Sequence, residues 1–217
     1  MSAALQASLL DLADDITLGC LGDTVTRRPL GSGAWLDARP GWLTGADALF
    51  DSLLDSVPWR AEEREMYQRI VAVPRLLSFY DEDAPLPHPV LTQARDQLSA
   101  HYAEELGEPF RTAGLCLYRD GRDSVAWHGD RIGRSRTEDT MVAILSVGAP
   151  RQLLLRPRAG SPGSPGSRTG VLRHNLGHGD LIVMGGSCQR TWEHAVPKTS
   201  KPVGPRISIQ FRTRGVR

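Results

Sequence analysis

The sequence contains very little lysine and no long apolar stretch. Of its 26 basic residues only Lys198 and Lys201 are lysines, and the formal net charge is +1. Arginine in place of lysine is also what a GC-rich genome produces, so it does not by itself predict nucleic-acid binding. No apolar run approaches the ~20 residues that a membrane-spanning helix needs. The composition therefore predicts a soluble globular protein.

Cysteine is scarce as well. Cys20, Cys116 and Cys188 form no C-x-x-C pair, which argues against a disulfide framework and against a cysteine-based zinc site. The opening segment carries early aspartates and no basic leader, so we do not expect a secretory signal. Together these features lead us to expect a protein of the reducing cytoplasm.

The sequence pattern in the first half of the chain predicts helices and few strands. Its 217 residues suffice for one domain and are few for two. Apolar residues at helical spacing predict helices over residues 44–57 and 89–106, with Pro89 at the start of the second and Gly107 at its end. An apolar run predicts a strand over residues 70–80, preceded by a cluster of charged residues to which no element is assigned. Residues 1–40 indicate short strands or irregular structure.

The second half changes to short β-like runs separated by glycine, proline or aspartate. These runs cover residues 114–118, 124–128, 140–147, 152–155, 171–175, 180–184 and 206–213. They predict a mainly β, α+β fold, a sandwich or jelly roll on which the helices pack within a single domain. The Gly/Ser/Pro-rich residues 159–167 predict a mobile loop between two strands.

A His-x-Asp motif ends the stretch from Tyr118 to Asp130. If residues 124–128 form a strand, His128 and Asp130 project from the same face, with the small Gly129 between them. One imidazole and one carboxylate suit a metal that takes N and O donors, and non-haem Fe(II) oxygenases use two histidines and one carboxylate. The motif therefore calls for a second histidine.

His194 is the best candidate for that second histidine, since it follows a glycine-rich turn and precedes a proline. For the other four histidines a packing or surface role is the simpler interpretation. These are His88, His101, His174 and His178.

Polar and apolar side chains alternate along residues 206–212. The residues that share the polar face are Arg206, Ser208, Gln210 and Arg212. This face is either a solvated edge or the interior of a barrel that holds an anion. The second alternative suits a dicarboxylate, because the planar guanidinium pairs with a carboxylate through two N–H groups.

In combination, these motifs resemble the AlkB family of iron and 2-oxoglutarate-dependent dioxygenases. The resemblance covers roughly residues 70–214 and rests on residues 74–80, 117–118, 123–130, 179–186, 192–198 and 205–212. It implies a double-stranded β-helix, with residues 1–110 as an N-terminal extension and substrate-loop region and residues 111–217 as the catalytic core of one domain.

The resemblance also implies the roles of individual residues. The implied Fe(II) ligands, which are the catalytic residues, are His128, Asp130 and His194. The implied 2-oxoglutarate-binding residues are Tyr118, Arg206, Ser208, Gln210 and Arg212. The candidate substrate contacts are Phe79, Tyr80 and Arg131, and for the two aromatic side chains core packing is the open alternative.

Two positions depart from the family pattern. The usual Asn-x-Tyr is Cys116-Leu117-Tyr118 here, which replaces an amide donor with a weak thiol donor. Several repair members carry an acidic residue after the His-x-Asp motif, where this chain has the arginine-rich residues 131–136. A carboxylate there would favour cationic methylated bases, and none is present.

The resemblance implies an oxidative demethylase that hydroxylates N-methyl groups of alkylated bases in DNA or RNA, with loss of formaldehyde. Such a base must leave its stack to be reached. We expect a monomer that acts on single-stranded DNA, in the cytoplasm. The alternatives are an Fe(II)/2-oxoglutarate hydroxylase of a protein or small molecule, and a non-catalytic metal-binding or nucleic-acid-binding protein. Asp130 argues against a halogenase, which needs a small residue at that position.

Overall fold

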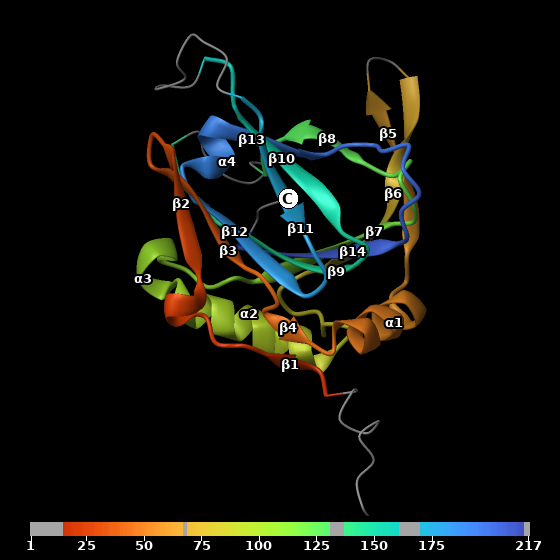
Figure 1. Ribbon diagram of the computed structural model, residues 1–217, viewed down its shortest axis with the longest axis horizontal. Coiled ribbons are helices and arrows are strands. Elements are labelled where there is room, and N and C mark those ends of the chain that lie inside the picture. Colours follow the sequence, from red (N-terminus) through yellow and green to blue (C-terminus); the bar gives the residue numbers. More distant parts are fainter. Residues whose placement is uncertain (1–14, 67–68, 131–136, 161–169, 215–217) are drawn as a thin grey trace, which may run out of the picture.

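Two antiparallel sheets face each other in the computed structural model, which describes residues 15–66, 69–130, 137–160 and 170–214 (Figure 1). The larger sheet has the strand order β2-β3-β12-β9-β14-β7-β6-β5, and the smaller has the order β11-β10-β13-β8. This arrangement confirms the predicted mainly β, α+β jelly roll.

Eight strands form the larger sheet. They are β2 (Thr26–Gly31), β3 (Ala34–Arg39), β5 (Arg60–Met66), β6 (Arg69–Tyr80), β7 (Thr112–Tyr118), β9 (Val142–Gly148), β12 (Asp180–Gly186) and β14 (Arg206–Arg212). The smaller sheet consists of β8 (Val125–His128), β10 (Arg151–Pro157), β11 (Leu172–Leu176) and β13 (Trp192–Val196). A separate short pair joins β1 (Thr17–Leu18) to β4 (Leu43–Thr44).

The helices cover the face of the larger sheet that points away from the smaller one (Figure 1). They are α1 (Ala46–Ser56), α2 (Pro89–His101) and α3 (Ala103–Leu106); a 3-10 turn, η1, spans Gly22–Thr24, and the short α4 (Cys188–Thr191) joins β12 to β13. No helix in the described ranges is long and apolar enough to cross a membrane.

Alternation along the strands produces two apolar cores. On β14, Ile207, Ile209 and Phe211 face the helices and are fully buried. Their neighbours on the strand face the space between the two sheets, where apolar residues such as Leu153 and Leu155 form the second core. A strand buried on both faces thus presents its polar residues to an enclosed space.

Both predicted helices are confirmed, and their ends follow local chemistry. Helix α2 begins where the His88 imidazole accepts a hydrogen bond from the backbone of Val90 at 3.2 Å, with Pro89 in the first turn. The pattern ends at Gly107, whose φ of 72° lies in the left-handed region that glycine tolerates. Tyr102 divides the predicted segment into α2 and α3.

The prediction missed three strands, of which the two-residue β4 runs into the start of the predicted helix over residues 44–57. Strand β5 was left unassigned because its sequence is dominated by charge, which is common on the outermost strand of a sheet. Strand β13 was not predicted as a strand although His194 within it was singled out. The predicted mobile loop lies largely outside the described residues, as does Arg131.

Candidate metal centre and anion pocket

Three side chains converge between the sheets. His128 ends β8 and is the register partner of His194 on β13, and Asp130 follows His128 by two residues. Their ligand atoms all lie within 4.8 Å of one another. The two imidazole centroids are 4.2 Å apart, and His128 Nε2 is 3.6 Å from Asp130 Oδ1. Two nitrogens and one oxygen thus converge, as in the two-histidine, one-carboxylate sites of non-haem iron.

The His128 ring is oriented by its own strand. Its Nδ1–H donates to the carbonyl of Ala126 at 2.8 Å, which leaves the Nε2 lone pair for a metal. Gly129 lets the next turn approach, because a Cβ at this position would lie 2.6 Å from the carbonyl oxygen of Gln189. The small residue between the two ligands is therefore required by packing.

Asp130 is held as a carboxylate. Burial alone would raise its pKa, but the Arg212 guanidinium and the two imidazoles outweigh burial and lower the pKa to about 2. Arg212 donates to Asp130 Oδ2 from Nη2 at 3.1 Å and from Nε at 3.3 Å. Burial lowers the pKa of His194 to about 3, so this imidazole is neutral near pH 7. A neutral imidazole and an ionised carboxylate are the states that metal binding needs.

The polar face of β14 turns into the protein. The solvated-edge alternative is wrong, because β14 lies between β9 and β7 and Arg206 is only 1% exposed. Arg206 Nε donates to Ser146 Oγ at 2.8 Å, while its Nη1 is buried with no hydrogen-bond partner in the described structure. Its guanidinium carbon lies 5.3 Å from the ring centroid of Tyr118. A buried guanidinium with an unused N–H fits the carboxylate of a dicarboxylate co-substrate.

The position that departs from the family pattern, Cys116 on β7, lies beside this polar face as the register partner of Ser208. Gln210 Nε2 donates to Cys116 Sγ at 3.7 Å and lies 3.4 Å from Ser208 Oγ. Its Oε1 accepts from Arg212. A side-chain amide therefore stands beside the cysteine, supplied by the neighbouring strand.

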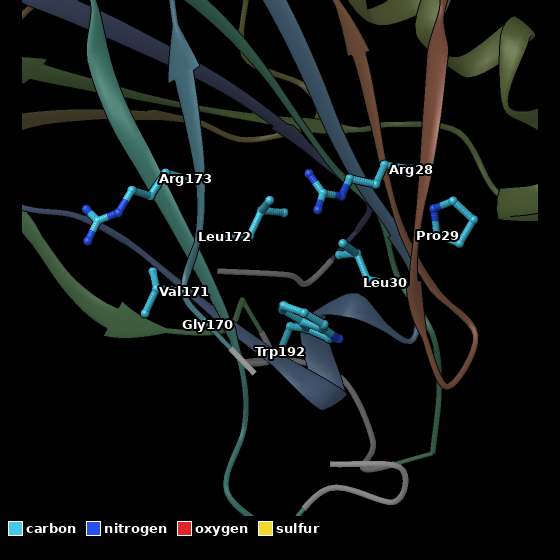
Figure 2. Close-up of a pocket in the computed structure, with 8 residues that line it drawn as sticks. All are labelled: Arg28, Pro29, Leu30, Gly170, Val171, Leu172, Arg173 and Trp192. Atoms are coloured by element: carbon cyan, nitrogen blue, oxygen red, sulfur yellow. The ribbon is translucent and has the colours of Figure 1, made fainter. Parts of the chain in front are cut away.

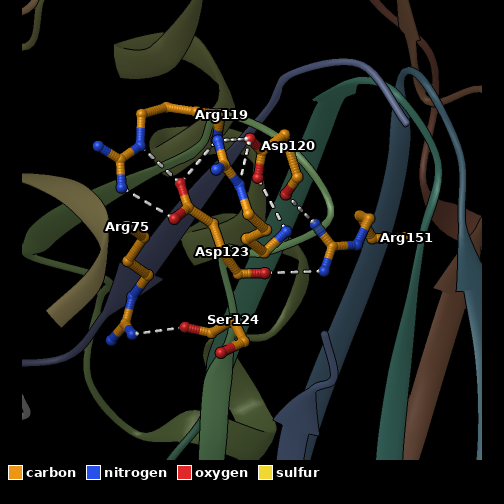
Figure 3. A network of polar contacts seen from close by, with 7 residues as sticks. Arg75, Arg119, Asp120, Asp123, Ser124 and Arg151 are labelled. Atoms are coloured by element: carbon orange, nitrogen blue, oxygen red, sulfur yellow. Dashed lines mark hydrogen bonds and ion pairs between the residues drawn. The ribbon is translucent and has the colours of Figure 1, made fainter. Parts of the chain in front are cut away.

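A network of polar contacts fixes the loop between β7 and β8 (Figure 3). Arg119 pairs with Asp123 through Nε at 2.8 Å and Nη2 at 2.9 Å, and Arg122 pairs with Asp120. These two arginines, which flank the motif in sequence, are thus engaged by carboxylates of their own loop.

Arginines from other strands complete the network (Figure 3). Arg151 donates to the carbonyls of Asp120, Asp123 and Pro197 at 3.0, 2.9 and 2.7 Å. Arg75 on β6 donates to the carbonyl of Ser124 at 3.0 Å. The network therefore ties β6, β10 and the segment after β13 to the loop that leads into His128.

The other histidines have local roles. His88 caps α2, and His178 Nδ1 accepts from the backbone N–H of Gly148 at 2.7 Å. His101 lies edge-on to Tyr102 on α2, and His174 is on β11. Within the described ranges, the group of His128, Asp130 and His194 is the one constellation of three such ligands.

The two aromatic candidates for substrate contact lie on opposite faces of β6. Phe79 is the register partner of Gly114 on β7 and is 43% exposed. A Cβ at Gly114 would lie 2.9 Å from Arg212 Nη1, so this face of the sheet carries the arginine that contacts Asp130. Tyr80 instead packs on the helix-side core. Only Phe79 of the pair is thus placed towards the metal centre.

Several residues of the site carry no sequence signal of their own. Gln189 accepts from the backbone N–H of Asp130 at 3.0 Å, and Ser146 contacts Arg206. Both lie away from the motifs and reach them only through tertiary contacts. Arg151 falls one residue before the predicted strand over residues 152–155, whereas the observed β10 begins with it.

Comparisons with known proteins agree with this geometry. A profile of the 2OG-Fe(II) oxygenase superfamily matches residues 78–212. Alpha-ketoglutarate-dependent dioxygenase alkB homolog 3 of Bos taurus is 34% identical over 192 residues, which cover 80% of this chain and 64% of that protein. DNA oxidative demethylase ALKBH2 of Homo sapiens is 32% identical over 124 residues, covering 57% of this chain and 46% of that protein. The chain thus spans less than two thirds of the length of these relatives.

The solved structure of OsALKBH1 shares the fold. It superposes with a TM-score of 0.56 at 15% sequence identity, covering 86% of this chain and all of that one. The predicted AlkB-type double-stranded β-helix is therefore confirmed.

Proposed function

The chain belongs to the 2OG-Fe(II) oxygenase superfamily as an AlkB homologue, and on this premise we propose that it oxidatively demethylates alkylated bases in nucleic acid, DNA foremost. It is a dioxygenase that uses Fe(II), 2-oxoglutarate and O2. The substrate class is supported by its similarity to alkB homolog 3 and to a protein named DNA oxidative demethylase.

The observation that carries the proposal is the pairing of a metal centre with a buried, partly unsatisfied arginine between the same two sheets. We assign Fe(II) to His128, Asp130 and His194. We assign one carboxylate of 2-oxoglutarate to Arg206, whose Nη1 has no partner in the described structure. When bound, these groups and O2 supply the oxidation that hydroxylates an N-methyl carbon.

The protein's own residues hold the groups of the site in position. Arg212 holds the Asp130 carboxylate by two hydrogen bonds, and Gln189 holds its backbone. Burial raises the pKa of the Tyr118 phenol to about 12, so beside Arg206 it stays neutral. The hydroxymethyl product breaks its C–N bond without further help, giving formaldehyde and the unmodified base.

We also propose that the chain works as one Fe(II)/2-oxoglutarate dioxygenase domain. Strands β2 and β3 precede residue 111 and belong to the same sheet as β12 and β14. Residues well ahead of the catalytic core thus help to build it.

Release of succinate and formaldehyde tests the proposal. Purified protein is incubated with Fe(II), 2-oxoglutarate, ascorbate and single-stranded DNA that carries 1-methyladenine or 3-methylcytosine. Formaldehyde formed in step with succinate is the expected result. Succinate without formaldehyde would point to hydroxylation of a protein or small molecule instead, and neither product from metal-loaded protein would favour a non-catalytic binding role.

A further inference from the structure

A hollow of about 450 Å³ opens between the edge strands β2 and β11. Its lining comprises Arg28, Pro29, Leu30, Gly170, Val171, Leu172, Arg173 and Trp192. Figure 2 shows Arg28, Leu30, Leu172 and Trp192 converging on the space between the strands, whereas Arg173 extends away from it. Ligand sites of small-molecule size fall in the range of ~300–1,000 Å³, so the hollow can hold one nucleotide unit.

The lining combines an aromatic and apolar surface with two arginines, of which only Arg28 points into the hollow (Figure 2). None of its residues is acidic, and the Arg28 guanidinium makes no ion pair or side-chain hydrogen bond within the described part of the chain. Trp192 and Leu172 are partly buried against the core between the sheets. An arginine without an ion pair and a partly exposed indole in one hollow suit a phosphate joined to a flat base, since bases stack on aromatic side chains and phosphates pair with arginine.

Register places this hollow beside the metal centre. His128, His194, Leu155 and Leu172 are successive partners across the four strands of the smaller sheet. At ~4.8 Å between strands, Leu172 is roughly 10 Å from His194 along this row. Trp192 precedes His194 by two residues on β13, so both side chains share a face about 7 Å apart. In this row only Leu155 separates Leu172, which lines the hollow, from the assigned iron ligand His194.

We infer that this hollow binds the nucleotide next to the methylated one on the same strand, with its phosphate on Arg28 and its base against Trp192. The inference rests on the proposed function and adds to it a second subsite. It predicts that the protein prefers an oligonucleotide to a modified mononucleotide, because only the oligonucleotide occupies both positions.

Turnover of two substrates separates the subsite from the metal centre. The substrates are a trinucleotide with central 1-methyladenine and the mononucleotide 1-methyl-dAMP. For the trinucleotide, Arg28→Gln and Trp192→Leu should raise KM by about five- to a hundredfold, as loss of a stacking contact does, with kcat unchanged. Turnover of the mononucleotide should not change. Trp192→Phe, which keeps an aromatic face, should restore most of the affinity.

Arg95→Gln is the matched control. Arg95 lies on α2, on the far side of the larger sheet, and its removal takes away the same charge. It should leave the KM of the trinucleotide unchanged. A rise in KM with Arg95→Gln equal to that with Arg28→Gln would reduce the effect to net charge and overturn the subsite.

Binding of unmodified, fluorescein-labelled hexathymidylate, followed by anisotropy, needs no turnover. Arg28→Gln should weaken binding and lower the salt-dependence slope by about one. Unchanged binding in both Arg28→Gln and Trp192→Leu would overturn the subsite, while formaldehyde release by the wild type would still support demethylation. Binding that depends on Arg28, without formaldehyde release by the wild type, would support the subsite and contradict demethylation. A wild type that binds no hexathymidylate would overturn the subsite whatever its turnover.

Discussion

The backbone N–H of Asp130 donates to the side-chain oxygen of Gln189 at 3.0 Å, so the α4 turn holds the loop that carries the carboxylate ligand. Gln189 is 1% exposed. Gln189→Leu keeps the volume and removes the acceptor. We expect the affinity for Co(II), as a stand-in for Fe(II), to fall by about 10–100-fold, the usual cost of losing a partner behind a metal ligand.

Titration of the apoprotein with Co(II), followed by visible absorption, measures this change. Arg190→Gln is the control on the same turn, because Arg190 pairs with the exposed side chain of Asp139. Equal Co(II) affinity in the wild type and in Gln189→Leu would show that the loop is positioned without Gln189.

Removal of a metal ligand should abolish turnover and metal binding together. His128→Ala and Asp130→Ala each take one donor from the converging group. We expect no iron-dependent succinate formation and no Co(II) absorption band. His101→Gln, an exposed histidine on α2, should retain both. Activity retained after either ligand is removed would move the metal centre elsewhere.

Arg206 and Arg151 lie on the same tyrosine and should respond differently to substitution. Their guanidinium carbons are 5.3 and 5.6 Å from the Tyr118 ring centroid. Arg206→Met should raise the KM for 2-oxoglutarate steeply, since we propose that its Nη1, which has no partner in the described structure, pairs with a carboxylate of that anion. Arg151→Met should leave this KM near the wild-type value.

The Arg151 variant should lose stability instead. Arg151 satisfies three backbone carbonyls, so its removal should lower the free energy of unfolding by about 2–4 kcal/mol. Urea denaturation measures the unfolding, and succinate release at varied 2-oxoglutarate measures the KM. An unchanged KM in Arg206→Met would place the co-substrate elsewhere.

The three thiols should differ sharply in reactivity. Burial raises the pKa of Cys188 to about 12, and Cys116 is buried too, whereas Cys20 is exposed. A raised pKa means that the thiol stays protonated; at pH 8 only roughly one Cys188 in ten thousand is the reactive thiolate. We expect DTNB to label one thiol quickly in the native protein and three after unfolding.

Cys20→Ser should remove the fast phase of labelling. Rapid labelling that persists in this variant, assigned to Cys188 by peptide mass, would contradict the burial of α4. The same experiment measures how fast Cys116, which is buried beside Gln210, reacts in the native protein, and we expect no fast labelling of it.

Periodicity predicted the parts of this site that lie along single strands. The alternation from Arg206 to Arg212 follows from strand geometry. The His128–Asp130 spacing marked the metal centre, although β8 ends at His128 and Asp130 lies in the loop that follows. Whether the polar face of β14 met solvent or the interior depended on β7 and β9 flanking it, which no local pattern encodes. Gln189 was missed for a related reason, because its contact spans 59 residues of sequence. Strand β5 was not predicted because its charged sequence gives no apolar strand pattern, although its backbone pairs with β6.

The pairing of β3 with β12 has a consequence for how far the chain can be shortened. Six residues of β12 find partners on β3, from Leu181 with Arg39 to Gly186 with Ala34. A piece that starts at residue 78, where the superfamily match begins, would leave that whole side of β12 with unpaired amides and carbonyls. An unpaired sheet edge of this kind forms hydrogen bonds with strands of other molecules. The shortened protein should therefore aggregate, although it keeps every assigned iron ligand.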